Sequence, residues 1–104
     1  MKKLPILWDK KAKDNLDNIY DYLAEDSIVA ARYVKRELIK LTNSLNHFPE
    51  KYPKEYYLKE EPENYRSVAK WAYKIIYEVT DDCLIIVDIF HTSRHPLNIK
   101  NVKE

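Results

Sequence analysis

The chain has 104 residues, of which 45% are hydrophobic and 34% charged, and these values are typical of one soluble globular domain over residues 1–104. Its 18 basic and 17 acidic side chains leave a formal net charge of only +1, so any basic binding site must be local. The absence of glycine excludes glycine-rich phosphate loops and dinucleotide folds, and one cysteine with three histidines excludes a standard zinc site, so we expect neither cofactor nor metal.

Residues 4–8 (LPILW) are a short apolar run that predicts a strand, with Pro5 at its start. Asp9 ends this run after about five residues, whereas a signal peptide needs about 7–15. No segment is long enough to cross a bilayer. The single cysteine cannot form an internal disulfide, which is typical of a reducing compartment. From these observations together we expect a cytoplasmic protein without membrane contact.

Two amphipathic helices follow. Apolar residues recur at steps of three and four over residues 10–25, after Asp9 as a helix N-cap. The same spacing continues from the cap at Asp26 and Ser27 to about residue 46. Since the connection between them is only a few residues long, the two helices are predicted to form an antiparallel hairpin.

Prolines at positions 49, 53 and 62 predict a loop between the second helix and the strands. The segments 66–70, 72–79 and 83–90 are rich in β-branched and aromatic residues and predict three strands. The segment TDD at 80–82 is typical of a tight turn in which aspartate takes the place of glycine. Residues 83–90 are apolar at nearly every position, which indicates a central strand covered on both faces.

Together these elements predict an α+β fold in the order β-α-α-β-β-β. Its helical hairpin packs on one face of a four-stranded, mostly antiparallel sheet. Trp8 and Trp71 are interpreted as core or sheet-packing residues.

Nearly the whole chain resembles the RelE/ParE superfamily of bacterial type II toxins, which are the growth-arresting halves of toxin–antitoxin pairs. The resemblance is carried by WDKKAKDNLDNIYDYLAEDS, ARYVKRELIKLTNSLNHFP, EEPENYRSVAKWAYKIIYEVTDDCLIIVDIFHTSRHP and the order of the elements. In this superfamily one face of the sheet packs on the helices and the other is a shallow concave surface.

The resemblance suggests a target-binding role for three cations. Side chains from strands about 4.8 Å apart can converge, so we expect Arg66, Lys74 and Arg94 to form a compact patch that binds phosphate. The simpler alternative is that the strand cations Arg66, Lys70 and Lys74 are solvated on the exposed face and balanced by nearby glutamates.

One branch of the superfamily cuts messenger RNA on the ribosome, which requires an acid, a base and several cations in one place. In such relatives the positions that match Arg66, Val68, Lys74 and Arg94 are basic, and a tyrosine lies near the position of Lys100. This sequence departs from that pattern because Val68 is uncharged and no tyrosine follows residue 77.

Histidine can replace the missing groups in this ribonuclease alternative. His91 and His95 flank Arg94 in the segment HTSRH and can act as acid or base near neutral pH. The catalytic candidates are then Arg94, His91, His95, Lys74 and Arg66. A purely structural role for both histidines is the alternative.

IYDYLAEDS and LKEEPENYRS leading into YKIIYEV are more similar to the ParE-like branch, which inhibits DNA gyrase and is not an enzyme. This resemblance implies binding to gyrase, with Arg94 in the C-terminal segment as a contact. It also implies a cognate antitoxin, an oligomer with that antitoxin and a role in plasmid stabilization.

The loop residues Tyr52, Tyr56 and Tyr57 are candidate anchors for the antitoxin, or else a lid on the core. A further alternative is a non-toxic, degenerate family member that serves only as an interaction or plasmid-maintenance module.

Overall fold

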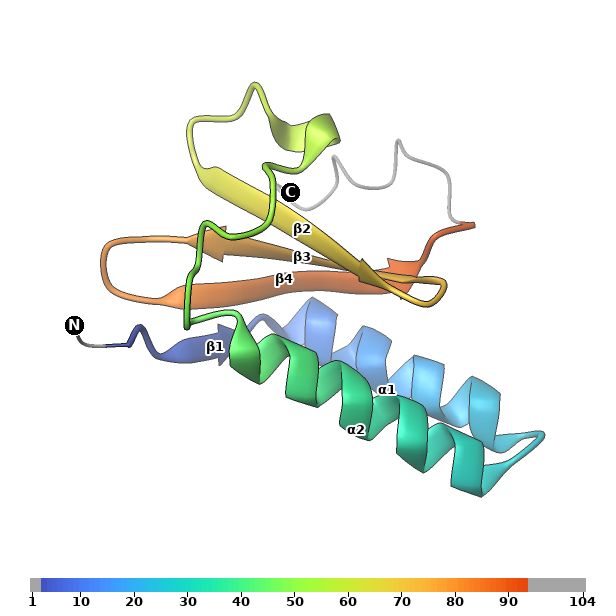
Figure 1. Ribbon diagram of the computed structural model, residues 1–104. Coiled ribbons are helices and arrows are strands. Elements are labelled where there is room, and N and C mark those ends of the chain that lie inside the picture. Colours follow the sequence, from blue (N-terminus) through green and yellow to red (C-terminus); the bar gives the residue numbers. More distant parts are fainter. Residues whose placement is uncertain (1–2, 94–104) are drawn as a thin grey trace.

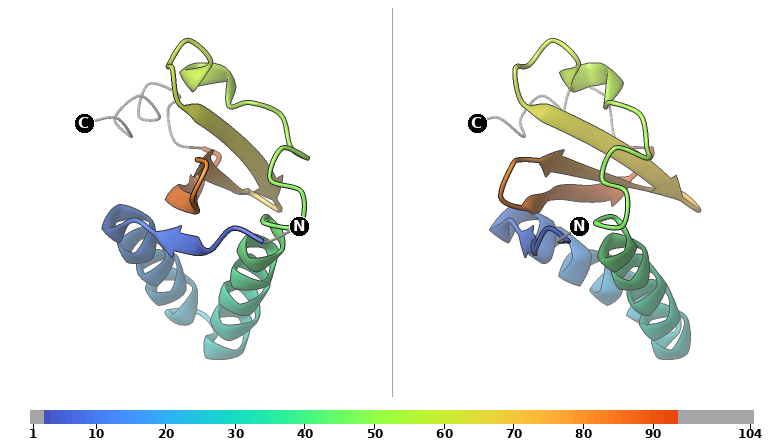
Figure 2. Two further views of the ribbon diagram at one scale, coloured as in Figure 1. Left: turned by 90° about the vertical axis from the view of Figure 1, so that its left-hand side faces the viewer. Right: turned by 60° about the vertical axis from the view of Figure 1, so that its left-hand side comes forward.

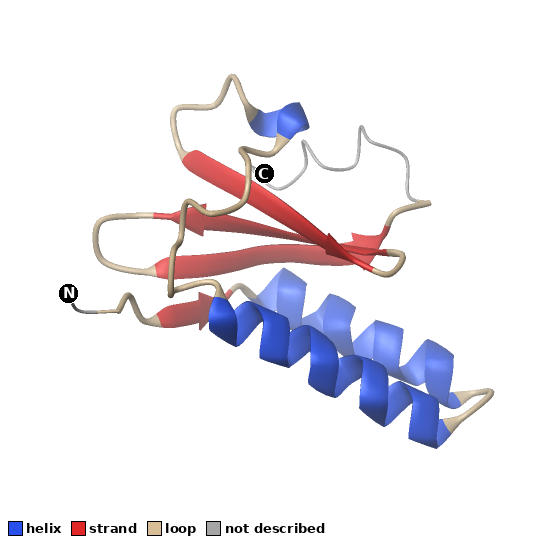
Figure 3. Cartoon of the chain, viewed as in Figure 1, coloured by secondary structure: helices blue, strands red, loops and turns tan. Residues whose placement is uncertain are grey.

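The computed structural model describes residues 3–93, and its elements follow the predicted order (Figures 1 and 3). They are β1 (Ile6–Trp8), α1 (Lys10–Ala24), α2 (Ile28–Ser44), a 3₁₀ turn (Tyr56–Leu58), β2 (Asn64–Lys70), β3 (Tyr73–Val79) and β4 (Leu84–His91). The α+β prediction is confirmed, with helix and strand bounds within about two residues of those expected.

The two helices form the predicted hairpin. Asp9 occupies the N-cap of α1, but its side chain makes no capping hydrogen bond. Ser27 does cap α2, because its hydroxyl accepts a hydrogen bond of 3.1 Å from the backbone N–H of Ala30. In residues 3–93, no helix combines the length and the apolar character that spanning a membrane requires.

The four strands form one mixed sheet in the order β1-β4-β3-β2. β1 is parallel to β4, whereas β3 is antiparallel to both of its neighbours. β4 is therefore an inner strand, as its continuous apolar sequence predicts.

Both faces of the sheet are covered, in two different ways (Figure 2). On one face Ile75, Tyr77 and Ile86 pack in a cluster with α1 and α2. On the other face, Leu58 of the 3₁₀ turn packs with a second cluster that includes Phe90. The face expected to be an open concave surface is thus partly closed by the 3₁₀ turn.

The loop before the 3₁₀ turn also protects the edge of β2. Lys54 forms an isolated bridge with Arg66. The N–H of Ser67 donates to the Pro53 carbonyl, and the N–H of Glu55 donates to the Tyr65 carbonyl. These bonds use backbone groups that an edge strand otherwise exposes.

The two hairpin turns work without glycine. Thr80 closes the β3–β4 turn, because its hydroxyl accepts hydrogen bonds from the N–H groups of Asp82 and Cys83. The prediction that aspartate supplies a glycine-like conformation there is wrong: among residues 3–93, only Trp71 has a positive φ, of 52°. Trp71 lies in the β2–β3 turn and is half exposed, whereas Trp8 packs against the core as predicted.

The buried hydroxyl of Tyr77 donates a hydrogen bond of 2.8 Å to the Pro49 carbonyl. Tyr77→Phe should lower the free energy of unfolding by about 1 kcal/mol, because it leaves this carbonyl without its donor. Urea unfolding at neutral pH measures the change. Tyr56→Phe is the matched control because that ring is 64% exposed, and equal losses in both variants would contradict the expectation.

Burial also raises the pKa of Tyr77 from 10.0 to about 12. Folding therefore favours the protonated hydroxyl, so its contribution to stability is complete below pH 10.0 and is lost as the pH rises through about 12. Tyr77→Phe should lack this part of the alkaline loss, as measured by urea unfolding at increasing pH. A wild-type alkaline profile in the variant would show that Tyr77 is not responsible.

Candidate functional site

Arg66 lies on β2 and holds the loop that precedes the 3₁₀ turn. Its guanidinium donates to the carbonyls of Tyr52 (2.7 Å) and Glu50 (3.3 Å) and to the side chain of Asn64 (3.1 Å). It also forms an ion pair of 3.3 Å with the carboxylate of Glu50. These partners occupy the donors that were predicted to bind phosphate.

Lys74 lies on β3 and pairs with a buried carboxylate. Its ammonium contacts Oε1 of Glu55, whose side chain is fully buried. Oε2 of Glu55 accepts a hydrogen bond of 2.7 Å from the N–H of Tyr57. The glutamate thus links the sheet to the 3₁₀ turn, and this charge pair is structural.

The two cations do not converge. Arg66 is directly opposite Tyr77, which packs in the helix-side cluster. Lys74 is directly opposite Ala69 on one side and Phe90 on the other, and Phe90 belongs to the cluster on the far face. Directly opposed residues share a face, so Arg66 and Lys74 lie on opposite faces of the sheet. The predicted compact patch is therefore wrong for these two residues.

The remaining strand cation, Lys70, lies 3.9 Å from the Glu37 carboxylate of α2. Arg94 and His95, as well as the segment that follows them, lie outside the described residues.

The loop tyrosines occupy two different environments. Tyr52 is partly buried and packs against the helix-side cluster, as a lid on the core does. Tyr56 and Tyr57 are exposed, and their rings meet edge to face at 5.2 Å between centroids. The ammonium of Lys59 lies 4.3 Å from the Tyr56 centroid.

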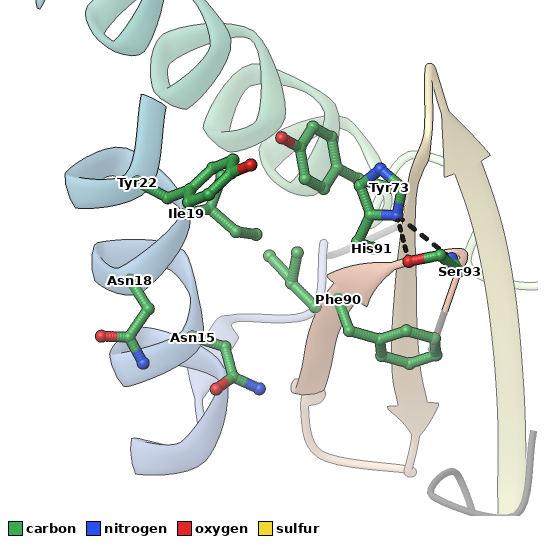
Figure 4. A pocket seen from close by; sticks show the side chains of 9 residues that line it. Asn15, Asn18, Ile19, Tyr22, Tyr73, Phe90, His91 and Ser93 are labelled. Carbon is green, nitrogen blue, oxygen red and sulfur yellow. Dashed lines mark hydrogen bonds between the residues drawn. The ribbon is translucent and has the colours of Figure 1, made fainter. Parts of the chain in front are cut away.

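A cleft of about 510 Å³ separates α1 from the adjoining ends of β3 and β4 (Figure 4). Its polar lining comes from Asn15, Asn18 and Tyr22 of α1, together with Tyr73, His91 and Ser93. Burial, with a smaller contribution from Tyr22, raises the pKa of the Tyr73 hydroxyl. Like any tyrosine hydroxyl, it is protonated at neutral pH and can donate a hydrogen bond, and the raised pKa extends this state to more alkaline pH.

His91 lines this cleft, and its ring is nearly perpendicular to that of Tyr73, at 5.6 Å between centroids. The backbone N–H of Ser93 lies 3.1 Å from Nδ1, and the Ser93 hydroxyl lies 2.8 Å from the same atom (Figure 4). A backbone N–H can only donate, so Nδ1 is an acceptor and the neutral ring carries its proton on Nε2.

The cleft offers polar and aromatic side chains to a bound group, but among the described residues it lacks the cations that binding a phosphate requires. Its described lining contains no arginine or lysine. His91 lies opposite Tyr73 on the helix side of the sheet, whereas Lys74 lies on the far face. The polar residues of α1 were missed by the sequence analysis, although Asn15, Asn18 and Tyr22 recur at steps of three and four.

Comparison with protein families gives a match to the family described as "ParE toxin of type II toxin-antitoxin system, parDE", over residues 6–96. The chain belongs to the ParE toxin family. This places it in the RelE/ParE superfamily, as the sequence resemblance indicated. A comparison with curated proteins gives no match to this ParE family member.

A solved structure, described as "Chromosomal ParDE TA system from P. aeruginosa", has a similar fold. Its TM-score is 0.69 at 20% sequence identity, and the match covers 86% of this ParE chain and 96% of the other. At this identity the similarity shows the fold alone.

The Glu55–Lys74 pair gives a test of its structural role. Glu55→Gln keeps an acceptor for the Tyr57 N–H but leaves Lys74 without a countercharge, so we expect the free energy of unfolding to fall by about 1–3 kcal/mol. Glu50→Gln, at the exposed partner of Arg66, should cost less than about 1 kcal/mol. Urea unfolding compares the two variants. The double variant Glu55→Gln/Lys74→Met should lose less than the sum of its single variants, and strict additivity would argue against the coupling.

Proposed function

We propose that this ParE family member is a toxin that arrests growth by binding and inhibiting DNA gyrase, and that it is not an enzyme. The observation that carries this proposal is the position of the strand cations. Arg66 and Lys74 lie on opposite faces of the sheet, and each is paired with a carboxylate. A binding function needs no convergence of these groups.

Cleavage of RNA makes stricter demands on geometry. An acid, a base and several cations must surround one phosphate. His91 lies in a cleft whose described lining has no arginine or lysine. Lys74 is on the other face of the sheet, and Arg66 lies opposite Tyr77, four residues along β3 from the partner of His91. Hydrogen bonds to Ser93 account for the orientation of His91 without a catalytic role. Arg94 stays a predicted contact to the target.

The cognate antitoxin is the second proposed partner, as the family description supports. Tyr56 and Tyr57 fit the role of anchors because they are exposed aromatic residues on a turn held by Glu55. Tyr52 is not included, since it packs against the core. Neutralised toxin is expected to form an oligomer with the antitoxin.

The target is tested with the purified chain in two parallel reactions. We expect it to inhibit gyrase supercoiling and to accumulate cleaved DNA, while ribosome-bound messenger RNA stays intact by primer extension. His91→Ala should leave gyrase inhibition unchanged. Codon-positioned RNA cuts that disappear in His91→Ala, with gyrase unaffected, would establish the ribonuclease alternative. A wild type that does neither and causes no growth arrest would support the non-toxic module.

The antitoxin contact is tested by Tyr56→Ala/Tyr57→Ala, which removes two exposed rings and leaves the Glu55 contact to the backbone intact. We expect affinity for the antitoxin to fall by about tenfold or more, as measured by calorimetry. Tyr22→Ala, which removes an even more exposed tyrosine from α1, is the control. Equal effects of the two changes would contradict a specific anchor.

A further inference from the structure

Among the helices and strands of residues 3–93, α2 has the largest excess of positive charge. This helix carries four cations and one carboxylate, whereas α1 carries three of each. Arg32, Arg36 and Lys40 recur at every fourth residue and are all exposed. A rise of about 1.5 Å per residue places them about 6 Å apart along one face of the helix.

These three cations have few partners. Within residues 3–93, the ion pairs that involve them are limited to one contact of 3.9 Å between Arg36 and Glu37. Glu37 also lies 3.9 Å from Lys70, so one carboxylate serves two cations. The face of α2 therefore carries an excess of positive charge.

Two exposed aromatic rings lie beside this charge, because Trp71 of the β2–β3 turn contacts Tyr33 of α2. Tyr33 is 48% and Trp71 52% exposed, and their centroids lie 5.9 Å apart. Lys70 lies 4.8 Å from the Trp71 centroid, and Arg36 lies 5.4 Å from that of Tyr33. We call this surface the α2–hairpin patch; it consists of Arg32, Tyr33, Arg36, Lys40, Lys70 and Trp71.

The backbone conformation at Trp71 is unusual for a bulky residue. Its φ of 52° lies in the left-handed region, where glycine or asparagine is usual and a bulky residue is strained. The Trp71 ring is also half exposed, so burial of the ring offsets only part of this strain. A strained, exposed aromatic residue is typical of a binding site.

We propose that the α2–hairpin patch binds single-stranded nucleic acid, with phosphates on the cations of α2 and a base stacked on Trp71. In a single strand every nucleotide supplies both a negative charge and a flat aromatic face, whereas a run of acidic residues supplies the charges alone. This inference goes beyond gyrase inhibition and does not depend on gyrase being the target.

The test is fluorescence anisotropy of the full chain with labelled single strands of DNA and RNA of one sequence, over a series of salt concentrations. Arg32→Ala/Arg36→Ala/Lys40→Ala should weaken binding and reduce the slope of log K against log salt by roughly 2, at about 0.7 per lost phosphate contact. Trp71→Gly should weaken binding about tenfold without changing this slope. Glycine relieves the positive φ but removes the contacts of the ring with Tyr33 and Lys70, so we expect the thermal stability to stay close to that of the wild type.

A control variant separates the patch from general charge. Lys10→Ala/Lys13→Ala/Lys59→Ala removes the same number of exposed cations elsewhere and should bind like the wild type. The proposal is overturned if both triple variants lose affinity equally, if neither strand binds at low salt, or if Trp71→Gly binds unchanged. It is also overturned if polyglutamate competes as well as the strands. Failure of gyrase inhibition with patch-dependent binding would reject the proposed target and leave this inference standing.

Discussion

The structure depends on the need to cover β3 and β4 on both faces. Their apolar residues point alternately toward the helices and away from them, so a single layer of helices leaves Ile76 and Phe90 without cover. The helical hairpin covers the first face with about 30 residues of regular structure. Within residues 3–93, the second face is covered by a loop and one 3₁₀ turn. A segment this short cannot hold itself in place, so polar contacts from the sheet must position it.

Those contacts determine what the strand cations do. Arg66 holds the incoming loop through the Tyr52 and Glu50 carbonyls, and Lys74 holds the turn through Glu55. Both residues are amphipathic cations whose stems lie along the sheet while their charged ends meet acceptors of the loop. The loop that covers the sheet presents polar acceptors at the points where it contacts β2 and β3. These acceptors explain why two strands with otherwise apolar sequences contain cations.

The sequence was sufficient to predict the helices, the strands and their order, because apolar spacing and turn residues are local signals. The orientation of side chains across the β2–β3 turn is a different kind of information. Arg66 and Lys74 are an even number of residues apart and would share a face in one continuous strand. The two-residue turn pairs Lys70 with Tyr73, so even positions on β2 oppose odd positions on β3. One residue more or less in the turn would have reversed the outcome.

The cleft and the patch were not predicted because both join residues from distant elements. The spacing of apolar residues identified the apolar side of α1. It could not show that Asn15 and Tyr22, at the border of that side, face the end of β4. In the same way, the sequence indicated that Trp71 packs on the sheet or in the core, whereas the β2–β3 turn places its ring against Tyr33 of α2. Composition could indicate only that a basic site must be local.

The net charge of +1 does not show where on the chain the unpaired cations lie. The three strand cations each have a carboxylate within ion-pair distance, and α1 carries as many carboxylates as cations. α2 differs because Glu37 is its only carboxylate and is shared between Arg36 and Lys70. A cation in a structural ion pair must leave its carboxylate before it can bind a polyanion, and this weakens the fold. An exposed cation without such a pair can bind a polyanion at little cost to stability. The distribution of ion pairs, more than the total charge, therefore determines where this small domain can bind a charged partner.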